Sequence, residues 1–222
     1  MTGDDDPLIV WARQGDKPGV RMFRNADAVA VACPDVSRKN RVAVHGTAEG
    51  VAALLGEVDS SYRPVGDEKL IDELAAICDR VEVAGRFGWM ETTTPVRAGA
   101  GTWLDRDDEV EDLLRTAFPQ SYAWPGGTGV RRWAGLAENG RLLATAAEAW
   151  SAPAVGFIAG VTTHPAARGR GLAVALCGFV TDELLREHGR AALFVDYWNT
   201  AALRTYRRLG YTLRPIAAAR LR

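Results

Sequence analysis

Cysteine and histidine are scarce in this chain of 222 residues, and their scarcity limits the chemistry that it can carry. The three cysteines, Cys33, Cys78 and Cys177, are scattered and form no CxxC pair, which argues against a disulfide framework. The three histidines are equally dispersed along the chain. We therefore expect no Cys/His metal site and no requirement for a metal.

An excess of charge of one sign and long apolar runs are also missing. Lys and Arg total 27 against 28 Asp and Glu, so there is no basic excess to hold nucleic acid or an anionic membrane. No run approaches the roughly 20 apolar residues that span a bilayer, and the acidic start MTGDDDPLIV lacks the apolar core of a signal peptide. We expect a cytoplasmic protein without nucleic-acid or membrane partners. Its richness in Ala, Arg and Gly is typical of a high-GC bacterium.

The two halves of the chain differ in their predicted secondary structure. Residues 8–92 contain short β-branched runs around two helical patterns, which predicts a small α/β module. The stretch ETTTPVRAGAGT (91–102) is rich in Thr, Pro and Gly and marks a boundary. We predict an N-terminal module over 1–94, which either helps to close the active site or mediates a homodimer, and a second domain over 95–222.

The second half predicts an antiparallel run of strands followed by late helices. A helix is expected over 105–118, a hairpin around Asn139-Gly140, and a third strand over 155–164. A helix over 171–188, a strand over 191–198, a helix over 200–209 and a last strand from 211 complete the order. This order predicts an α/β (α+β) fold with a mostly antiparallel mixed sheet and flanking helices.

The strongest signal for function is the turn between the strand over 155–164 and the helix that follows it. This turn carries Arg168, Gly169, Arg170 and Gly171. A helix start has unpaired N–H groups and the positive end of the macrodipole. Glycines let a diphosphate approach the backbone, and arginines add fork-shaped donors. The turn therefore predicts a diphosphate site without a metal.

Two common nucleotide motifs do not describe this turn. The dinucleotide fingerprint GxGxxG fails because Val174 follows Gly169 and Gly171 where a third glycine is required. No GKS or GKT follows, so the P-loop pattern is absent from the sequence. These departures disfavour a nicotinamide cofactor and a nucleoside triphosphate.

The turn instead resembles the Arg/Gln-x-x-Gly-x-Gly/Ala motif of the GNAT superfamily of acyl-CoA-dependent N-acyltransferases. Arg168, Gly171 and Ala173 fill its three defined positions. The later stretch from Asn199 through Tyr206 to Leu-Gly-Tyr (209–211) is similar to the second signature of that family. The resemblance is clear over about 150–214. The strand end and the turn are most similar to those of family members whose N-terminal half is a degenerate GNAT-like module. The resemblance implies a GNAT fold with a splayed sheet over 95–222.

The resemblance implies acetyl-CoA as the acyl donor. It implies that the main chain from Gly169 to Gly171, with Arg168 and neighbouring Leu172 and Ala173, binds the diphosphate. It also implies that Val161, Thr162 and Thr163 pair with the pantetheine arm as an extra strand would. The remaining implied cofactor contacts are Asn199, Ala202 and Tyr206.

The resemblance also implies direct attack of an amine on the thioester. Tyr206 is then the proton donor to the leaving thiolate, and simple packing of this ring is the alternative. The sequence departs from the family at the general base, because the strand over 155–164 has no carboxylate. Glu148 on the neighbouring strand is the candidate base, and a structural glutamate on the sheet is the alternative. Glu138, His164 and Asp196 are weaker choices.

The acceptor pocket is the least determined part of the prediction. Tyr122 and Trp124 lie in a loop that lines the acceptor site in the family, and Asp196 and Trp198 flank Asn199. We expect these four residues to contact a small-molecule primary amine. Acetylation of a protein or peptide N-terminus, and a CoA-binding sensor with weak activity, remain as alternatives.

Overall fold

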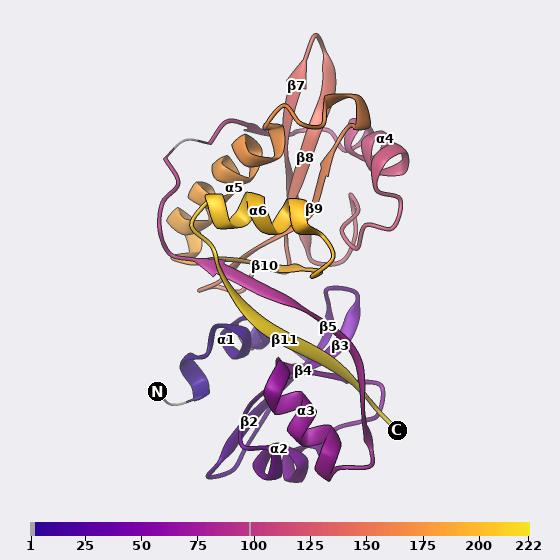
Figure 1. Cartoon of the computed structure of the whole chain (residues 1–222), viewed down its shortest axis with the longest axis vertical. Coiled ribbons are helices and arrows are strands. Elements are labelled where there is room, and N and C mark those ends of the chain that lie inside the picture. The colour runs from indigo at the N-terminus through magenta and orange to yellow at the C-terminus, as the bar shows by residue number, and fades with distance from the viewer. Residues whose placement is uncertain (1–2, 98) are drawn as a thin grey trace. The chain divides into compact units, whose positions relative to one another are not determined.

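The computed structural model describes residues 3–97 and 99–222 and divides the chain into two compact units (Figure 1). The first unit comprises residues 1–89, 152–154 and 213–222. The second comprises residues 90–151 and 155–212. No helix in the described residues is long and apolar enough to cross a membrane.

The first unit is a sheet with helices on its two faces. Its strand order is β1-β2-β3-β4-β11-β5, in which β3 and β4 run parallel and the pairs β1–β2, β2–β3 and β4–β11 run antiparallel. Its elements are η1 (Gly3–Asp5), α1 (Pro7–Arg13), β1 (Arg21–Arg24), β2 (Ala28–Val36), β3 (Lys39–Gly46), α2 (Ala48–Leu55), β4 (Arg63–Asp67), α3 (Glu68–Ile77), β5 (Val81–Thr92) and β11 (Thr212–Leu221).

Alternation along β2 separates the two faces of that sheet. Ala30 and Ala32 pack into one buried cluster with residues of α2, α3 and β11. Val29 and Val31 are also buried but point the other way, because successive strand residues alternate, and α1 packs on β2 and β3. Burial on both faces explains why β2 reads as a continuous apolar run rather than an alternating one.

The division into units differs from the predicted boundary at 94/95, above all at the C-terminus. Residues 213–222 belong to the first unit, because β11 pairs antiparallel with β4 and Ala217, Ala219 and Leu221 are buried in its core. The sequence predicts only the start of this strand, so its partner could not be foreseen. The division between the units falls at 89/90, inside β5, which is longer than the strand expected over 81–85.

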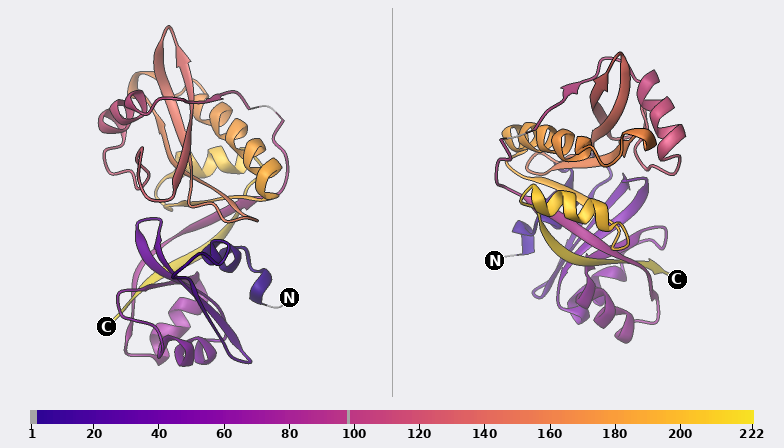
Figure 2. Two further views of the ribbon diagram at one scale, coloured as in Figure 1. Left: turned by 180° about the vertical axis from the view of Figure 1, so that it is seen from behind. Right: turned by 45° about the horizontal axis from the view of Figure 1, so that its top comes forward.

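The second unit has the strand order β5-β10-β9-β8-β7-β6. Helices α4 and α5 both pack on β8 and β9 and lie on opposite faces of the sheet (Figures 1 and 2). The remaining elements are β6 (Thr102–Trp103), α4 (Asp108–Ala117), β7 (Val130–Glu138), β8 (Arg141–Ala149), β9 (Gly156–Thr163), η2 (Pro165–Ala167), α5 (Leu172–His188), β10 (Ala191–Val195) and α6 (Thr200–Arg208).

Most local predictions for this unit are confirmed. The β7–β8 hairpin turns at Asn139 and Gly140, which have φ of 52° and 73° as a two-residue hairpin turn requires. Helix α6 ends before Gly210, whose φ of 85° suits a residue after a helix C-terminus. The strand expected over 191–198 is shorter, because β10 ends at Val195. Asp196 and Trp198 therefore lie in the loop that follows.

Candidate active site

Strands β9 and β10 separate soon after they meet. Their parallel pairing covers only Ala191 with Gly156 and Ala192 with Phe157, although β9 continues to Thr163. On its other edge β9 stays paired with β8 up to Thr163 opposite Ala144. Val161, Thr162 and Thr163 therefore lie where β9 has diverged from β10, and an extended ligand arm can add there as a strand would.

A β-bulge interrupts β9 in this open stretch. Ala147 pairs with Ala159 and Thr145 pairs with Thr162, so Gly160 and Val161 stand opposite the single residue Ala146. Gly160 has φ of 62°, and a Cβ there would lie 2.5 Å from a ring carbon of Trp133. Only glycine suits this position. A bulge leaves one residue outside the ladder and bends the strand locally. No sequence motif predicts this bulge.

The turn at 168–171 leads directly into a helix, as predicted. Helix α5 begins at Leu172 after Gly171, which has φ of 78° and caps the helix without any side-chain hydrogen bond. A Cβ added at Gly169 or Gly171 would meet nothing within 4 Å. Leu172 and Ala173 are half-buried in the first turn. The start of α5 therefore has no side-chain cap and has open space beside its two glycines, which suits an anion.

Helix α5 differs in this respect from every other α-helix in the described residues. Its first turn contains no acidic residue and its N-terminus has no side-chain cap. Helix α4 carries three acids in its first turn, which repel an anion. The others are capped by side chains, namely Asp6 at α1, Thr47 at α2, Asp67 at α3 and Asn199 at α6.

In the described part of the first unit, both junctions between a strand and a following helix differ from this turn. Between β3 and α2, Thr47 caps the helix with its own side chain. Strand β4 ends at Asp67 and α3 begins at Glu68, so no loop separates them. The Asp67 carboxylate accepts from the Lys69 amide and places negative charge where a phosphate would otherwise bind. This agrees with the absence of a second Arg-x-x-Gly-x-Gly/Ala motif from the first half of the sequence.

The two arginines of the turn have different surroundings. Arg170 forms a two-pronged ion pair with Glu138 at the end of β7, with N–O distances of 3.0 and 3.1 Å. Its guanidinium lowers the pKa of the Glu138 carboxyl. Arg168 is exposed and makes no ion pair within the described chain. Glu138, a weak candidate for the base, is therefore the partner of a residue in the diphosphate turn.

Glu148 lies on β8 as expected but is fully buried in an ion-pair network. Its carboxylate accepts from Arg132 Nε at 2.7 Å, from Arg131 Nη1 at 3.1 Å and from His188 Nε2 at 3.1 Å. Burial alone would raise the pKa of Glu148, but the hydrogen bonds from His188 and Arg132 and the charges of both arginines lower it to about 2. These contacts give Glu148 the surroundings of a structural carboxylate, which was the alternative to a catalytic one. Its role as general base stays a prediction, and the lowered pKa does not favour it.

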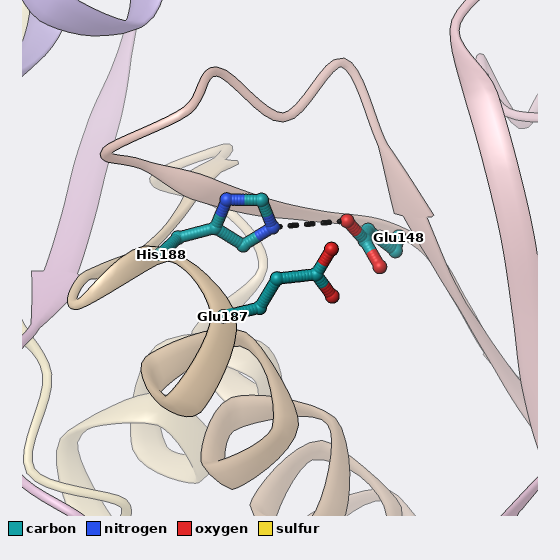
Figure 3. Close-up of side chains that lie close together, drawn as sticks. All are labelled: Glu148, Glu187 and His188. Carbon is teal, nitrogen blue, oxygen red and sulfur yellow. Dashed lines mark hydrogen bonds and ion pairs between the residues drawn. The ribbon is translucent and has the colours of Figure 1, made fainter.

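Figure 3 shows that Glu148 and His188 point toward each other with Glu187 beside them. Their ligand atoms lie within 4.8 Å of one another, a spacing that a metal ion could bridge. However, Arg131 bonds both carboxylates, and Arg132 Nη2 lies 2.8 Å from Glu187. Two arginines thus balance two carboxylates. The group anchors the last turn of α5 to β7 and β8, and sequence reasoning missed it because its members are far apart along the chain.

Tyr206 faces the interior of the second unit. It is 5% exposed, and its ring lies 5.5 Å from that of Tyr211. Burial raises the pKa of Tyr206 well above its usual value, and also raises that of the Cys177 thiol to about 12. The phenol therefore keeps its proton at neutral pH, as a proton donor must. Its contact with a thiolate stays a prediction.

Asn199 begins α6 rather than lying free beside the splay. Its side-chain oxygen accepts from the Ala202 amide at 3.1 Å, which is ordinary N-capping. The predicted contacts of Asn199 and Ala202 with the cofactor arm remain predictions. The family signature asparagine has at least this structural task in the chain.

The four predicted acceptor residues come from two loops. Tyr122 is 51% exposed in the loop between α4 and β7, where Trp124 is half-buried and its Nε1 donates to the Ser121 carbonyl at 2.8 Å. Asp196 and Trp198 follow β10 at the open end of the splay, and Trp198 is 78% exposed. Large exposed aromatic side chains are suited to contact a ligand or partner.

Comparison with solved structures shows the same fold in acetyltransferases. A GCN5-related N-acetyltransferase from Kribbella flavida is 18% identical with a TM-score of 0.64, covering 96% of this chain and 94% of its own. A putative GNAT acetyltransferase from Novosphingobium aromaticivorans is 18% identical with a TM-score of 0.61, covering 97% of both chains. A functionally unknown protein from Staphylococcus epidermidis, 11% identical with a TM-score of 0.56, covers all of this chain and 98% of its own. No curated protein sequence matches the chain.

The family model described as the acetyltransferase (GNAT) family matches residues 99–211, just over half of the chain. This match spans the splayed strands, the diphosphate turn, α5 and α6. Members of this family use acetyl-CoA as a co-substrate. The chain therefore belongs to the GNAT family and is an acyl-CoA-dependent acetyltransferase.

Proposed function

We propose that the protein transfers an acetyl group from acetyl-CoA to the primary amine of a small molecule, by direct attack of the amine on the thioester. The observation that carries this proposal is the open start of α5, where Gly169 and Gly171 leave the first amides uncovered. In this proposal the diphosphate of acetyl-CoA lies at that helix start. Its pantetheine arm follows Val161–Thr163 along the edge from which β10 has diverged.

The thioester then lies close to the bulge in β9. The attack turns the thioester carbonyl into an oxyanion, which main-chain N–H groups freed from the ladder at Gly160–Val161 can stabilise. Tyr206 donates its proton to the leaving thiolate, since burial keeps the phenol protonated. Acetyl transfer then forms the amide bond and breaks the carbon–sulfur bond, with the sulfur leaving as a thiol. The proton that the attacking nitrogen loses as the amide forms returns through water to the Tyr206 phenolate.

Deprotonation of the attacking ammonium requires another group, because Glu148 is engaged in its ion-pair network. Strand β9 contains no carboxylate. Asp196 is exposed at the open end of the splay and is the carboxylate that we assign to binding the ammonium, with water accepting the proton. This arrangement favours an amine that is partly neutral at the working pH, since no strong base removes its proton.

Acceptor class is best tested by release of CoA thiol from acetyl-CoA with a panel of small amines and of peptides with free N-termini. We expect turnover with small amines and little with peptides. Preferential turnover of peptides would support N-terminal acetylation instead. Tight binding of acetyl-CoA without turnover of either panel would support the sensor alternative.

A further inference from the structure

Two cationic or donor side chains lie beside the diphosphate turn and are not used in the mechanism above. Arg141 begins β8, and His164 follows β9 directly before the turn. The backbone brings them together, since the His164 amide donates to the Leu143 carbonyl at 2.8 Å. The ion pair between Glu138 and Arg170 joins the same end of the hairpin to the turn itself. Arg141 is therefore close in structure to the residues that bind the diphosphate.

The His164 ring faces two hydrogen-bond donors but can accept from only one of them. Arg141 Nη2 lies 2.8 Å from His164 Nε2, and the Ala166 amide lies 3.2 Å from His164 Nδ1. Both neighbours of the ring are obligatory donors, whereas a neutral imidazole has one acceptor nitrogen and one N–H. Whichever ring nitrogen carries the proton, its N–H points at another donor, so one of these two contacts is not a hydrogen bond. An anion that accepts from Arg141 and His164 together relieves the conflict.

Positive charge gathers around the turn. Arg141, Arg168 and Arg170 contribute three positive charges, and Glu138 pairs with one of them, Arg170. The diphosphate is already matched by the uncapped amides and dipole of α5. Arg141 is exposed, and the ring of His164 is its one side-chain partner among the residues that the structure describes. Its guanidinium has free donors for a second anionic group.

We propose that Arg141 and His164 bind a phosphomonoester that lies next to the diphosphate, namely the 3′-phosphate on the adenosine of acyl-CoA. This inference rests on the proposed binding of acetyl-CoA at α5. A phosphomonoester offers several oxygens to both donors, and its charge at neutral pH approaches −2. The pair thereby distinguishes CoA from the same thiol without its 3′-phosphate.

A protein-by-ligand double cycle tests this proposal. Dissociation constants of CoA and 3′-dephospho-CoA are measured by calorimetry for the native protein and for Arg141→Gln. Arg106→Gln is the matched control, since Arg106 is 71% exposed and lies in the loop before α4. We expect the native protein to prefer CoA by about tenfold to a hundredfold, as charge-assisted hydrogen bonds allow. Arg141→Gln should remove most of that preference, and Arg106→Gln should keep it.

Three outcomes would overturn the inference. Equal affinity of the native protein for both ligands would show that no side chain reads the 3′-phosphate, and would leave a phosphorylated acceptor as the other source of a phosphomonoester. Equal weakening of both ligands by Arg141→Gln would assign Arg141 to the diphosphate. An unchanged preference in Arg141→Gln would assign the 3′-phosphate to other residues. If neither ligand binds the native protein, the proposed cofactor site fails, which is a different result from any of these three.

Discussion

Arg170 in the diphosphate turn and Glu138 at the end of the β7–β8 hairpin form a two-pronged ion pair, with N–O distances of 3.0 and 3.1 Å. Both side chains are about half exposed, so the pair contributes little to stability. Its effect falls on the ligand instead. Glu138 places a negative charge beside the proposed phosphate site and occupies donors of Arg170.

Glu138→Gln should therefore tighten the binding of CoA. The substitution removes the repulsion and frees Arg170, and an exposed charge of this kind changes affinity by about two- to fivefold. Calorimetric titration at low and at moderate salt measures the change, which should shrink as salt screens it. Glu109→Gln is a control, because Glu109 lies in α4 and pairs with Arg106 instead of an arginine of the turn. Weaker binding of CoA by Glu138→Gln would contradict this account.

Gly171→Glu should abolish detectable binding of CoA while the protein stays folded. The new carboxylate would project into the open space at the start of α5 and repel the diphosphate, a loss of about a hundredfold or more in affinity. Gly189→Glu is a closely matched control, because Gly189 ends the same helix with φ of 75° and equal open space. Both variants share the backbone strain of a side chain at positive φ. Normal CoA binding by Gly171→Glu would remove the basis of the diphosphate site.

The sequence predicts local structure in the second unit because each signal there acts within a few residues. Gly171 begins a helix and Asn139-Gly140 forms a hairpin turn through their own backbone preferences. The bulge at Gly160 is different, since it depends on the distant ring of Trp133, which excludes a Cβ at that position. The pairing of β11 with β4 is also a long-range choice. Such long-range contacts cannot be predicted from the hydrophobic and turn patterns of neighbouring residues.

The role of Glu148 illustrates the same limit at the active site. Alternation along β8 puts Glu148 on the same face as Ala144 and Ala146, but it cannot tell what surrounds the carboxylate. The two arginines precede it by 16 and 17 residues, and His188 follows by 40. These partners convert a carboxylate that resembles a base into a fixed anion. The motif that predicts the cofactor turn lies within a few consecutive residues, whereas the surroundings of a candidate base depend on the packing of one individual sequence.

Tyr206→Phe should lower kcat by about a hundredfold with little change in the KM for acetyl-CoA, if its phenol protonates the leaving thiolate. Tyr211→Phe is the control, because Tyr211 is an adjacent buried tyrosine whose hydroxyl bonds that of Thr181 at 2.8 Å. Both variants lose one buried hydroxyl, so a purely structural effect would appear in each. Steady-state kinetics separate the two cases. Equal losses of kcat in both variants would end the catalytic role of Tyr206.

Glu148→Gln should destabilise the fold without changing the pH dependence of kcat. Removal of one member of a buried ion-pair network costs about 3 kcal/mol, because it leaves the arginines without their charge partner. The pKa of Glu148 is lowered from 4.5 to about 2. Its stabilisation is therefore complete above pH 4.5 and is lost as the pH falls toward 2.

Urea unfolding of the native protein and Glu148→Gln at several pH values measures this effect. The difference in unfolding free energy should be largest at neutral pH and should shrink between pH 4.5 and the lowest pH at which the protein folds. The kinetic comparison is made at a temperature where both proteins are folded. A new dependence of kcat on pH in Glu148→Gln would restore Glu148 as a base.

Trp198→Ala should raise the KM for the acceptor by about tenfold while the affinity for acetyl-CoA stays the same, as loss of an aromatic contact does at binding sites. The side chain of Trp198 is 78% exposed, so its removal creates no cavity and costs little stability. Phe118→Ala is the control, because Phe118 is an exposed aromatic residue directly after α4. Kinetics with the best amine of the panel and calorimetry with acetyl-CoA separate the two substrates. Since Trp198 follows β10 where the sheet has opened, an unchanged acceptor KM would place the amine on the other side of the splay, toward the loop that carries Tyr122 and Trp124.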